Sequence, residues 1–353
     1  MPRRLWLPSG LDERVGSWTA DFIGAVSNGG CHQGDGVRVC SQASLPQSRW
    51  AAALAEAGLG FHSEAYSWCV VFGRSQVREL LSSQGMHPRR SLGQNFVVDA
   101  NTTRRIAQLA GVGPADHVVE IGPGLGALTQ ALLETGAAVT AVERDPRLID
   151  VLKAELEGSA VTLVKGDAMH LDWNGLLGQE QWVMVSNLPY NVATPLVVGI
   201  LEEVHQVKRM LVMVQREVGE RMVATAGGQA YGAVSVKVAY FANAKIARRV
   251  ARTVFVPQPK VDSVLVDIHR RDRPGLEPAM VSYEELCKVL RAGFAHRRKM
   301  LRRSLAAMAG PEVFAKAGIS GEARAEELDL AAWGRLAAAC TSDLLNPEPG
   351  RSR

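Results

Sequence analysis

The tetrapeptide Asn187-Leu188-Pro189-Tyr190 has the residue types needed to hold an exocyclic amine for reaction. An aromatic amine such as N6 of adenine is a poor nucleophile, because its lone pair is delocalised into the ring, so it must be polarised and positioned. The Asn187 amide oxygen and the Leu188 carbonyl can accept the two amine hydrogens, Pro189 fixes the bend, and Tyr190 offers a stacking face. Neither a general base nor a metal is required, and we expect no metal site.

A glycine-rich turn lies upstream of this tetrapeptide. The β-rich run His117–Ile121 is followed by Gly122-Pro123-Gly124-Leu125-Gly126 and then by a helical pattern through Leu133. Glycines let the backbone approach a ligand, and the start of a helix offers free N–H groups. The spacing differs from that of dinucleotide-binding turns, and a purely structural turn would look the same. The turn is therefore informative only together with its neighbours.

Acidic residues end the next two predicted strands. The strand Ala138–Val142 ends at Glu143, about 20 residues after the first glycine, where a carboxylate can take both hydroxyls of a ribose. The strand Val161–Lys165 ends at Gly166-Asp167, and Asp167 is placed to accept from an adenine amine. Either acid alone could be a helix cap. Two acids at successive strand ends after a glycine turn favour a nucleotide-like ligand.

The remaining periodicity predicts a mostly parallel sheet with an antiparallel addition. We expect helices at Ser75–Ser83 and Asn101–Ala110 and further strands at Trp182–Ser186, Met210–Gln215, Arg248–Phe255 and Ser263–His269.

Composition narrows the class of protein. The 353 residues, 47% of them hydrophobic, can bury a substantial core, but no apolar run is long enough to cross a bilayer and no signal peptide is evident. We therefore expect a cytoplasmic protein. The five cysteines are an odd number without Cys-x-x-Cys spacing, which argues against disulfides and zinc. The net charge is only +4, but Arg and Lys are concentrated after Lys245, which favours an anionic partner.

Residues 1 to about 70 lack sustained periodicity, apart from a possible short helix at Ala51–Leu59. The spacing of Cys31-His32 and Cys40 fits no common metal site. We interpret residues 1–70 as a poorly ordered extension, or as upstream sequence included by a mis-assigned start, with translation beginning near Val70 or Val71.

From about Ser75 to Leu305 the chain resembles the ribosomal RNA adenine N6-dimethyltransferase family of bacteria (the KsgA type) and eukaryotes. The motifs that carry the resemblance, in family order, are Gly93-Gln94-Asn95-Phe96, Glu120-Ile121-Gly122-Pro123-Gly124, Glu143, Gly166-Asp167-Ala168, Asn187-Leu188-Pro189-Tyr190-Asn191, Gln215-Arg216-Glu217-Val218 and the run from Phe255-Val256-Pro257 through Pro259-Lys260-Val261-Asp262-Ser263. Leu92 stands where the family usually has a basic or aromatic residue before Gly93, which is a modest departure. Residues 1–70 have no counterpart in the family pattern, so the resemblance implies no role for them.

The resemblance implies a class I S-adenosylmethionine-dependent methyltransferase, with a Rossmann-like, mostly parallel seven-stranded sheet over residues 71–273. A small helical RNA-binding domain over 274–345 and a disordered tail over 346–353 would follow. It also implies dimethylation of two neighbouring adenines in a hairpin loop near the 3′ end of small-subunit (16S) ribosomal RNA, with Phe255 stacking on the base opposite Tyr190. The donor contacts that it implies are Asn95, Val97, Gly122, Gly124, Glu143, Asp167 and Asn187.

Basic residues are candidates for contact with RNA phosphates. Leu290, Phe294, Leu301 and Leu305 form an apolar stripe at helical spacing, and the remaining faces are crowded with cations. Because the charged residues of this predicted helix are nearly all positive, phosphate binding is favoured over simple solvation. We expect RNA contacts from Arg216, Arg221, Arg297, Arg298 and Arg302. The partner would be an immature 30S particle, bound by a monomer.

Two other functions remain open. One is an Erm-like methyltransferase that modifies large-subunit (23S) RNA and confers antibiotic resistance, although Leu188, in place of the more usual Ile, and the proline-rich motif after Phe255 favour the small subunit. The other is a ribosome-assembly factor in which binding matters more than catalysis. A DNA adenine methyltransferase is disfavoured, because that class typically has an acidic residue where this chain has Asn187.

Overall fold

The computed structural model describes residues 31–34, 37–40, 73–83, 85–89 and 92–345. The chain divides into two compact units, Met1–Ser63 and Glu64–Arg353. In the first unit, β1 (Cys31–Gly34) and β2 (Val37–Cys40) form an antiparallel hairpin with Cys31 opposite Cys40. The sequence analysis predicted no strand there. The predicted helix Ala51–Leu59 and the predicted tail 346–353 lie outside the described residues.

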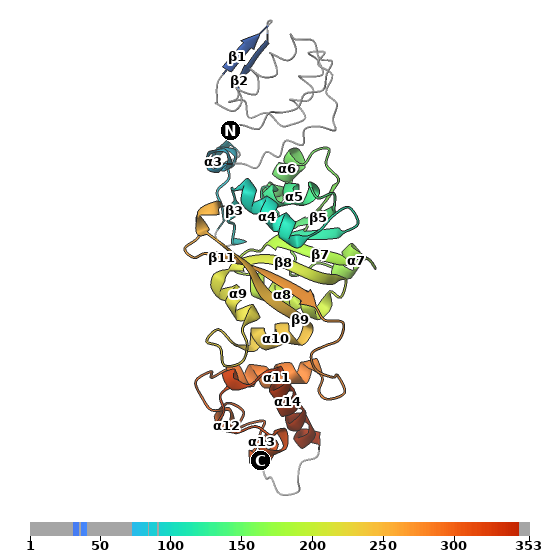
Figure 1. Ribbon diagram of the computed structural model, residues 1–353, viewed down its shortest axis with the longest axis vertical. Helices are drawn as coiled ribbons and strands as arrows, with labels where there is room; N and C mark the ends of the chain where they lie inside the picture. Colours follow the sequence, from blue (N-terminus) through green and yellow to red (C-terminus); the bar gives the residue numbers. More distant parts are fainter. Residues whose placement is uncertain (1–30, 35–36, 41–72, 84, 90–91, 346–353) are drawn as a thin grey trace, which may run out of the picture. The chain divides into compact units, whose positions relative to one another are not determined.

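The second unit is built on a seven-stranded sheet in the order β6-β5-β4-β7-β8-β11-β9 (Figure 1). The first five strands in this order are parallel, and β11 pairs antiparallel with both β8 and β9. This confirms the predicted fold. The strands are β4 (His117–Ile121), β5 (Ala138–Glu143), β6 (Val161–Lys165), β7 (Trp182–Asn187), β8 (Val207–Gln215), β9 (Ala242–Val250) and β11 (Ser263–Arg270).

One predicted strand was wrong. The chain does not form a single strand at Arg248–Phe255, because β9 ends at Val250 and a 3-10 turn, Arg252–Val254, follows. In this turn the Arg252 backbone N–H donates to the side chain of Asp262, at a distance of 3.0 Å from Oδ1. The chain then forms β10 (Phe255–Val256), which pairs with β3 (Phe96–Val97) instead of the main sheet.

Helices cover both faces of the sheet (Figure 1). The predicted helices are confirmed as α3 (Arg74–Ser83) and α4 (Ala100–Ala110), and the side chain of Asp99 caps α4 by accepting from the Thr102 N–H at 2.8 Å. The other helices of this region are α5 (Ala127–Leu133), α6 (Pro146–Glu155), α7 (Trp173–Leu177), α8 (Ala193–Glu203), α9 (Arg216–Val223) and α10 (Ala233–Phe241).

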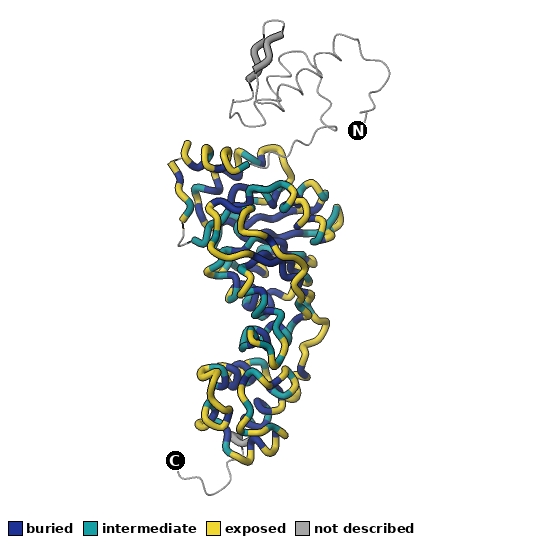
Figure 2. Tube along the Cα trace, turned by 60° about the vertical axis from the view of Figure 1, so that its left-hand side comes forward, coloured by how far each residue is buried: buried dark blue, intermediate teal, exposed yellow. Residues whose placement is uncertain are grey.

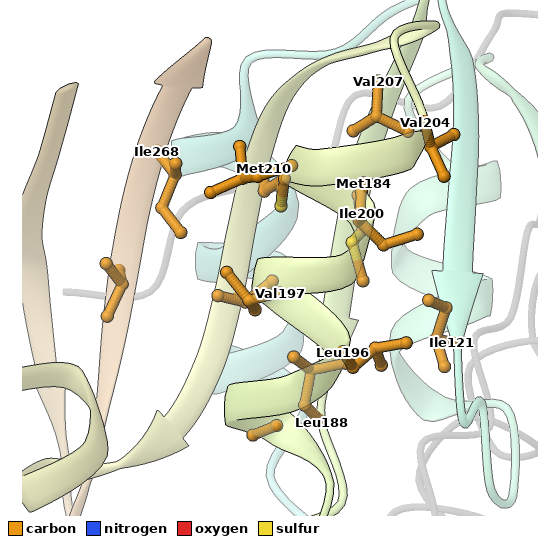
Figure 3. Close-up of a cluster of buried hydrophobic side chains, with 14 of the residues drawn as sticks. Ile121, Met184, Leu188, Leu196, Val197, Ile200, Val204, Val207, Met210 and Ile268 are labelled. Atoms are coloured by element: carbon orange, nitrogen blue, oxygen red, sulfur yellow. The ribbon is translucent and has the colours of Figure 1, made fainter. Parts of the chain in front are cut away.

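The apolar core is built on the two faces of the sheet. On one face, α8 directs Leu196, Val197 and Ile200 toward Met184 of β7 and Met210 of β8 (Figure 3). On the other face, side chains of α4 and α5 pack on β4, β8 and β11. The central strands are consequently buried along their length, as the dark segments of Figure 2 show. Burial on both faces is why these strands are continuous apolar runs in the sequence.

The chain after Leu276 forms a second, helical core around the fully buried Trp333. Its elements are α11 (Tyr283–Phe294), α12 (Leu301–Ser304), α13 (Pro311–Ala317), the 3-10 turn Ala325–Glu327 and α14 (Leu330–Leu345). None of the helices in the described ranges is long and apolar enough to cross a membrane.

The predicted continuous helix through Leu290 and Leu305 was wrong. Helix α11 ends at Phe294, and the chain turns before α12 begins at Leu301. The Leu301 N–H donates to the Ala323 carbonyl at 2.8 Å, and Met300 forms a β-bridge with Arg324. Pairing with a distant segment therefore replaces the hydrogen bonds of a continuing helix, and the apolar stripe reflects one core contacted by two short helices.

The end of α8 far from the Asn187 tetrapeptide is held by Arg270, the last residue of β11. Its guanidinium donates to the carbonyls of Ile200, Leu201, Val204 and Val207 at 2.8–3.0 Å. Ile200 and Leu201 lie in the last turn of α8, where carbonyls run short of backbone donors, although Ile200 also accepts from the Val204 N–H at 3.0 Å. Val204 is the residue that caps this helix, and Val207 is the first residue of β8. Arg270 thus ties α8, which directly follows the tetrapeptide, to the antiparallel edge of the sheet.

We expect Arg270→Met to lower the free energy of unfolding by roughly 2 to 4 kcal/mol, because four carbonyls would each lose a charged donor in a partly buried position. Urea unfolding followed by circular dichroism would measure the change. Arg273→Met is the matched control, since Arg273 is exposed and makes no hydrogen bond or ion pair within the described ranges. Equal unfolding midpoints for the two variants would contradict the anchoring role.

Candidate active site

A cleft opens at the carboxyl ends of the parallel strands, between β4 and β7. The two strands pair only from His117 and Trp182 to Val119 and Met184. Beyond that point they diverge, and the Ile121 N–H donates to the Ser186 hydroxyl at 2.8 Å instead of a backbone carbonyl. The strand order also reverses direction at β4, and such switch points are where open α/β sheets bind ligands.

The cleft brings together every residue that was predicted to contact the methyl donor. Its lining includes Asn95, Val97, Gly122, Gly124, Glu143, Asp167 and Asn187. Leu188, Pro189 and Tyr190 line the same cleft. Residues from five separate chain segments therefore meet at one site, and their individual roles remain predictions.

The glycine turn after β4 has a left-handed backbone at each of its three glycines. Gly122, Gly124 and Gly126 have φ values of 71°, 64° and 83°, in the region that other residues avoid. A Cβ on Gly124 would lie 2.9 Å from the ring of Phe96. The turn consequently packs directly against the Gly93–Phe96 motif, and its backbone is left facing the cleft.

Glu143 holds this turn in place from the end of β5. Its carboxylate accepts from the Asp145 N–H at 2.8 Å and from the Gly124 N–H at 3.3 Å. The residue is 6% exposed, and burial raises the pKa of its carboxyl above the ordinary value, although these backbone hydrogen bonds oppose the shift. A carboxylate has about four acceptor sites, so two hydrogen bonds leave capacity for the hydroxyls of a ligand.

Glu120 is a second buried acid in the lining, in the middle of the motif that ends β4. It is 1% exposed and accepts from the Thr129 hydroxyl at 2.6 Å. Burial raises the pKa of Glu120 to about 8; the Thr129 hydrogen bond opposes this shift, and repulsion from Glu143 adds to it. The sequence analysis quoted Glu120 within its motif but assigned it no role.

Asp167 follows β6 at the outer side of the cleft. Its carboxylate forms an ion pair with Arg144 at 3.0 Å and lies 3.5 Å from His170 Nδ1. Its other oxygen accepts from the Met169 N–H at 3.1 Å. These contacts fix the carboxylate at the rim, where the sequence analysis expected an acceptor for an adenine amine.

The nitrogen of the Asn187 side-chain amide is hydrogen-bonded, and its oxygen is not. Its Nδ2 donates to the Asn95 carbonyl at 3.0 Å, which identifies the other amide atom as oxygen. The Oδ1 atom is buried and has no hydrogen-bond partner. A buried acceptor without a donor costs about 1 to 3 kcal/mol, so such a group inside a cleft points to a ligand that donates.

Tyr190 is oriented by a residue that the sequence analysis quoted but did not interpret. Its hydroxyl lies 2.8 Å from the hydroxyl of Ser263, the fully buried first residue of β11. Gly93 approaches the tetrapeptide so closely that a Cβ there would lie 2.8 Å from Asn191 Oδ1 and 3.0 Å from the Tyr190 nitrogen. The hydroxyl of Tyr190 and its backbone are thus both fixed, while the residue still lines the cleft.

Phe255 lies in the core and not in the lining of the cleft. Its side chain is 0% exposed and packs with Val97, Val250 and Leu265. It pairs through the β10–β3 ladder with Val97, which does line the cleft. A motif fixes where a residue lies along the chain, whereas the exposure of its side chain depends on tertiary packing. The stacking role of Phe255 stays a prediction, and the aromatic residues of the lining are Phe96 and Tyr190.

The predicted RNA-contacting arginines do not share one helical face. Arg298 lies in the turn between α11 and α12, whereas Arg302 lies in α12 and pairs with Glu322 at 3.4 Å. Arg297 is bound within the protein, to Glu326 at 2.8 Å and to the Gln229 carbonyl. On α9, the exposed Arg216 and Arg221 pair with Glu220 and Glu217 at 3.9 and 2.9 Å. Arg298 is exposed and forms no such ion pair in the described ranges.

The residues that the structure describes contain no group of three or more His, Cys, Asp and Glu side chains placed to hold a metal ion.

Comparisons with known proteins agree with this geometry. A family model described as ribosomal RNA adenine dimethylase matches residues 85–341. Ribosomal RNA small subunit methyltransferase A of Streptomyces avermitilis is 44% identical over 278 residues, covering 76% of this chain and 93% of that protein. The protein of the same name from Thermobifida fusca is 43% identical over 274 residues, covering 74% and 94%.

Two solved structures are similar. The 23S rRNA methyltransferase ErmE has a TM-score of 0.54 at 26% identity, covering 70% of this chain and 99% of its own. A dimethyladenosine transferase from Plasmodium falciparum has a TM-score of 0.58 at 24% identity, covering 68% and 95%, and this likeness concerns the fold. The chain belongs to the ribosomal RNA adenine dimethylase family.

The raised pKa of Glu120 predicts how stability depends on pH. A carboxyl whose pKa rises from 4.5 to about 8 on folding stabilises the fold fully below the unfolded value and loses that contribution as pH rises through about 8. Between about pH 6 and about pH 8 we expect the wild type to lose on the order of 2 kcal/mol relative to Glu120→Gln, which stays neutral. Urea unfolding across this range would measure it.

The control for this experiment is Glu134→Gln, which removes an exposed carboxylate that pairs with Arg104 at 3.3 Å. Its stability should follow the wild type across the pH range. Parallel curves for the wild type and Glu120→Gln would show that Glu120 is ionised in the folded protein.

Proposed function

We propose that this protein transfers methyl groups from S-adenosylmethionine to the N6 amines of two adjacent adenines in the 3′-terminal hairpin loop of small-subunit (16S) ribosomal RNA. The product is N6,N6-dimethyladenosine, formed during small-subunit biogenesis. The observation that carries the proposal is the buried, unpartnered Oδ1 of Asn187, which belongs to a side chain that lines the cleft beside the glycine turn. It is an acceptor held ready for an N–H donor.

The cleft residues fit S-adenosylmethionine, which supplies an electrophilic methyl group when bound. Gly122 and Gly124 leave space for close approach to the backbone, and a substituent on Gly124 would meet Phe96. Glu143 has acceptor sites left for the two ribose hydroxyls, and Asp167 stands at the rim as an acceptor for the adenine amine of the donor. Asn95 and Val97 line the opposite side.

The residues of the tetrapeptide are suited to the amine of the acceptor base. Asn187 Oδ1 can accept one amine hydrogen, and the Leu188 carbonyl can accept the other. The Leu188 N–H, in the preceding peptide group, donates to the Met213 carbonyl at 3.0 Å, which anchors the backbone on the amino side of this carbonyl against β8. Two fixed acceptors draw the N–H bonds into one orientation and aim the nitrogen lone pair, which replaces activation by a base.

Tyr190 supplies the stacking face for the target base. Ser263 holds the phenol from behind, so the ring does not have to be ordered when the base arrives. Adenines in a hairpin loop are unpaired or easily displaced, so extruding one costs less than flipping it out of a duplex.

We further propose that the protein acts in the cytoplasm as a monomer on an immature 30S particle. Arg298, exposed in the turn after α11, is the best placed of the predicted arginines to meet a phosphate. Arg216, Arg221 and Arg302 can do so by exchanging an exposed carboxylate partner for phosphate, whereas the two internal contacts of Arg297 favour a structural role.

The likeness to ErmE makes modification of large-subunit RNA the second candidate. The relatives named for the small subunit reach 44% identity over most of their length, against 26% for ErmE, and therefore favour the small subunit. Mapping of dimethylated adenines in both ribosomal RNAs, from cells with and without the gene, would decide. Marks that vanish from the large-subunit RNA alone would overturn the proposal.

We expect Asn187→Ala to lower turnover at least ~100-fold while binding to immature small subunits largely survives, because one preorganised contact at the reacting nitrogen is lost. Single-turnover transfer of labelled methyl groups would measure the change. The control Asn174→Ala removes an amide that accepts from Gln206 at 2.9 Å, outside the lining of the cleft. A near-normal rate of dimethylation by Asn187→Ala would remove the amine-binding role.

Glu143→Ala should weaken donor binding roughly 10- to 100-fold and raise the donor KM, with RNA affinity nearly intact, because charge-assisted hydrogen bonds to the ribose are lost. Isothermal titration with S-adenosylmethionine would measure it, and a thermal melt would check that the glycine turn remains folded. The control is Glu134→Ala, at the exposed end of α5. Unchanged donor affinity would exclude Glu143 from the ribose site.

A further inference from the structure

Strand β9 forms an outer edge of the sheet (Figure 1). Exposed cations lie at the end of β9 and in the chain that follows it. Arg248 and Arg249 lie near its end, Arg252 follows in the 3-10 turn, and Lys260 lies in the loop that leads to β11. All four residues are exposed. We refer to them as the edge cations.

The edge cations are not neutralised by the protein. In the described part of the chain, no carboxylate lies within 4.0 Å of any of them. Asp262, the acidic residue of the same loop, accepts from the Arg252 backbone N–H and not from its guanidinium. Farther along β9, by contrast, Lys245 is paired with Asp267 at 3.8 Å.

The neighbouring helix does not supply the missing charge. Helix α9 packs against β9 and carries Glu217 and Glu220. These two carboxylates already pair with Arg221 and Arg216 of the same helix. The surface formed by α9 and the end of β9 is therefore positive overall.

The row of cations begins beside the proposed position of the target base. Val250, the last residue of β9, pairs with Ser263, whose hydroxyl lies 2.8 Å from that of Tyr190. Arg249 and Arg248 are one and two residues further back, which is roughly 3 and 7 Å along the strand. An RNA chain that delivers a base to Tyr190 would thus have its neighbouring phosphates within reach of these guanidinium groups.

The two arginines lie on opposite faces of the edge. Arg249 pairs with Val264 and Arg248 with Leu265, and successive strand residues point to opposite sides. Val264 belongs to the core under α8 and α10, and Leu265 to the core under α4. The edge is therefore flanked by positive charge on both sides.

We propose that the edge cations bind phosphates of the ribosomal RNA segment that flanks the target adenines and so guide it to Tyr190. This inference rests on the proposed function and adds four cations, none of which is among the predicted arginines, beside Arg216 and Arg221 of α9. The competing explanation is that charged side chains on an edge strand prevent pairing with another sheet.

The test is the double variant Arg248→Gln/Arg249→Gln of the full chain, with a synthetic RNA of the 3′-terminal hairpin and its flanking strands as the probe. We expect RNA affinity to fall on the order of tenfold and the log–log salt slope to decrease by roughly 1.4 to 1.8, that is, 0.7 to 0.9 for each lost phosphate contact. The loss should appear in the RNA KM rather than in kcat, and donor affinity should not change.

The matched control is Lys153→Gln/Lys208→Gln, which removes the same charge from exposed positions on α6 and at the amino end of β8. Its salt slope should equal that of the wild type. An unchanged slope in the arginine variant would overturn the proposal, and self-association of that variant with unchanged RNA binding would establish the edge-protecting role instead. Because the wild type is assayed alongside for dimethylation of the same RNA, failure of the proposed function would show in the wild type itself.

Discussion

The hydrogen bond from Asn187 Nδ2 to the Asn95 carbonyl is the interaction on which the site depends. It fixes which end of the amide is free, and it joins the end of β7 to a segment 92 residues earlier in the chain. That segment can approach only because Gly93 has no side chain to collide with Asn191 and Tyr190. The free oxygen, the close backbone contact and the position of Tyr190 are therefore parts of one arrangement.

The sheet supplies what this arrangement requires. Because β4 and β7 separate after Val119 and Met184, the Asn187 end of β7 is free of its neighbour on that side and faces the glycine turn. The cleft also contains Glu120 of β4 and Glu143 of β5, and desolvation raises the pKa of both carboxyls. A cationic ligand would relieve this strain, since a nearby positive charge favours the ionised form of an acid. The burial that disfavours these two ionised carboxylates in the free protein therefore also favours binding of a positively charged methyl donor.

The parallel half of the fold could be predicted nearly to the residue. Strands β4 and β6 have the predicted ends. In β4, burial gives a run that stops at the glycine turn, and the partly exposed edge strand β6 stops at Gly166-Asp167. The edge strand β9 could not be predicted well, since its residues are largely exposed and give no period. The gap between α11 and α12 was hidden because both helices pack on one core and continue the same stripe. Ser263, Arg270 and the burial of Phe255 depend on contacts between distant segments, which no local pattern records.

Dimethylation places a requirement on the site that the first transfer does not. Adenine N6 carries two hydrogens, which match the two proposed acceptors Asn187 Oδ1 and the Leu188 carbonyl, but the monomethylated amine carries only one. One acceptor must therefore be without a donor during the second transfer. The Leu188 carbonyl follows a peptide group that is hydrogen-bonded to β8, whereas Asn187 Oδ1 is already buried without a partner in the free protein. The free protein thus tolerates an Oδ1 without a hydrogen-bond partner. Loss of the hydrogen bond between the amine and Oδ1 in the second transfer returns this atom to the state that it has in the free protein. The Leu188 carbonyl can then keep the remaining hydrogen while the new methyl group takes the place next to Asn187.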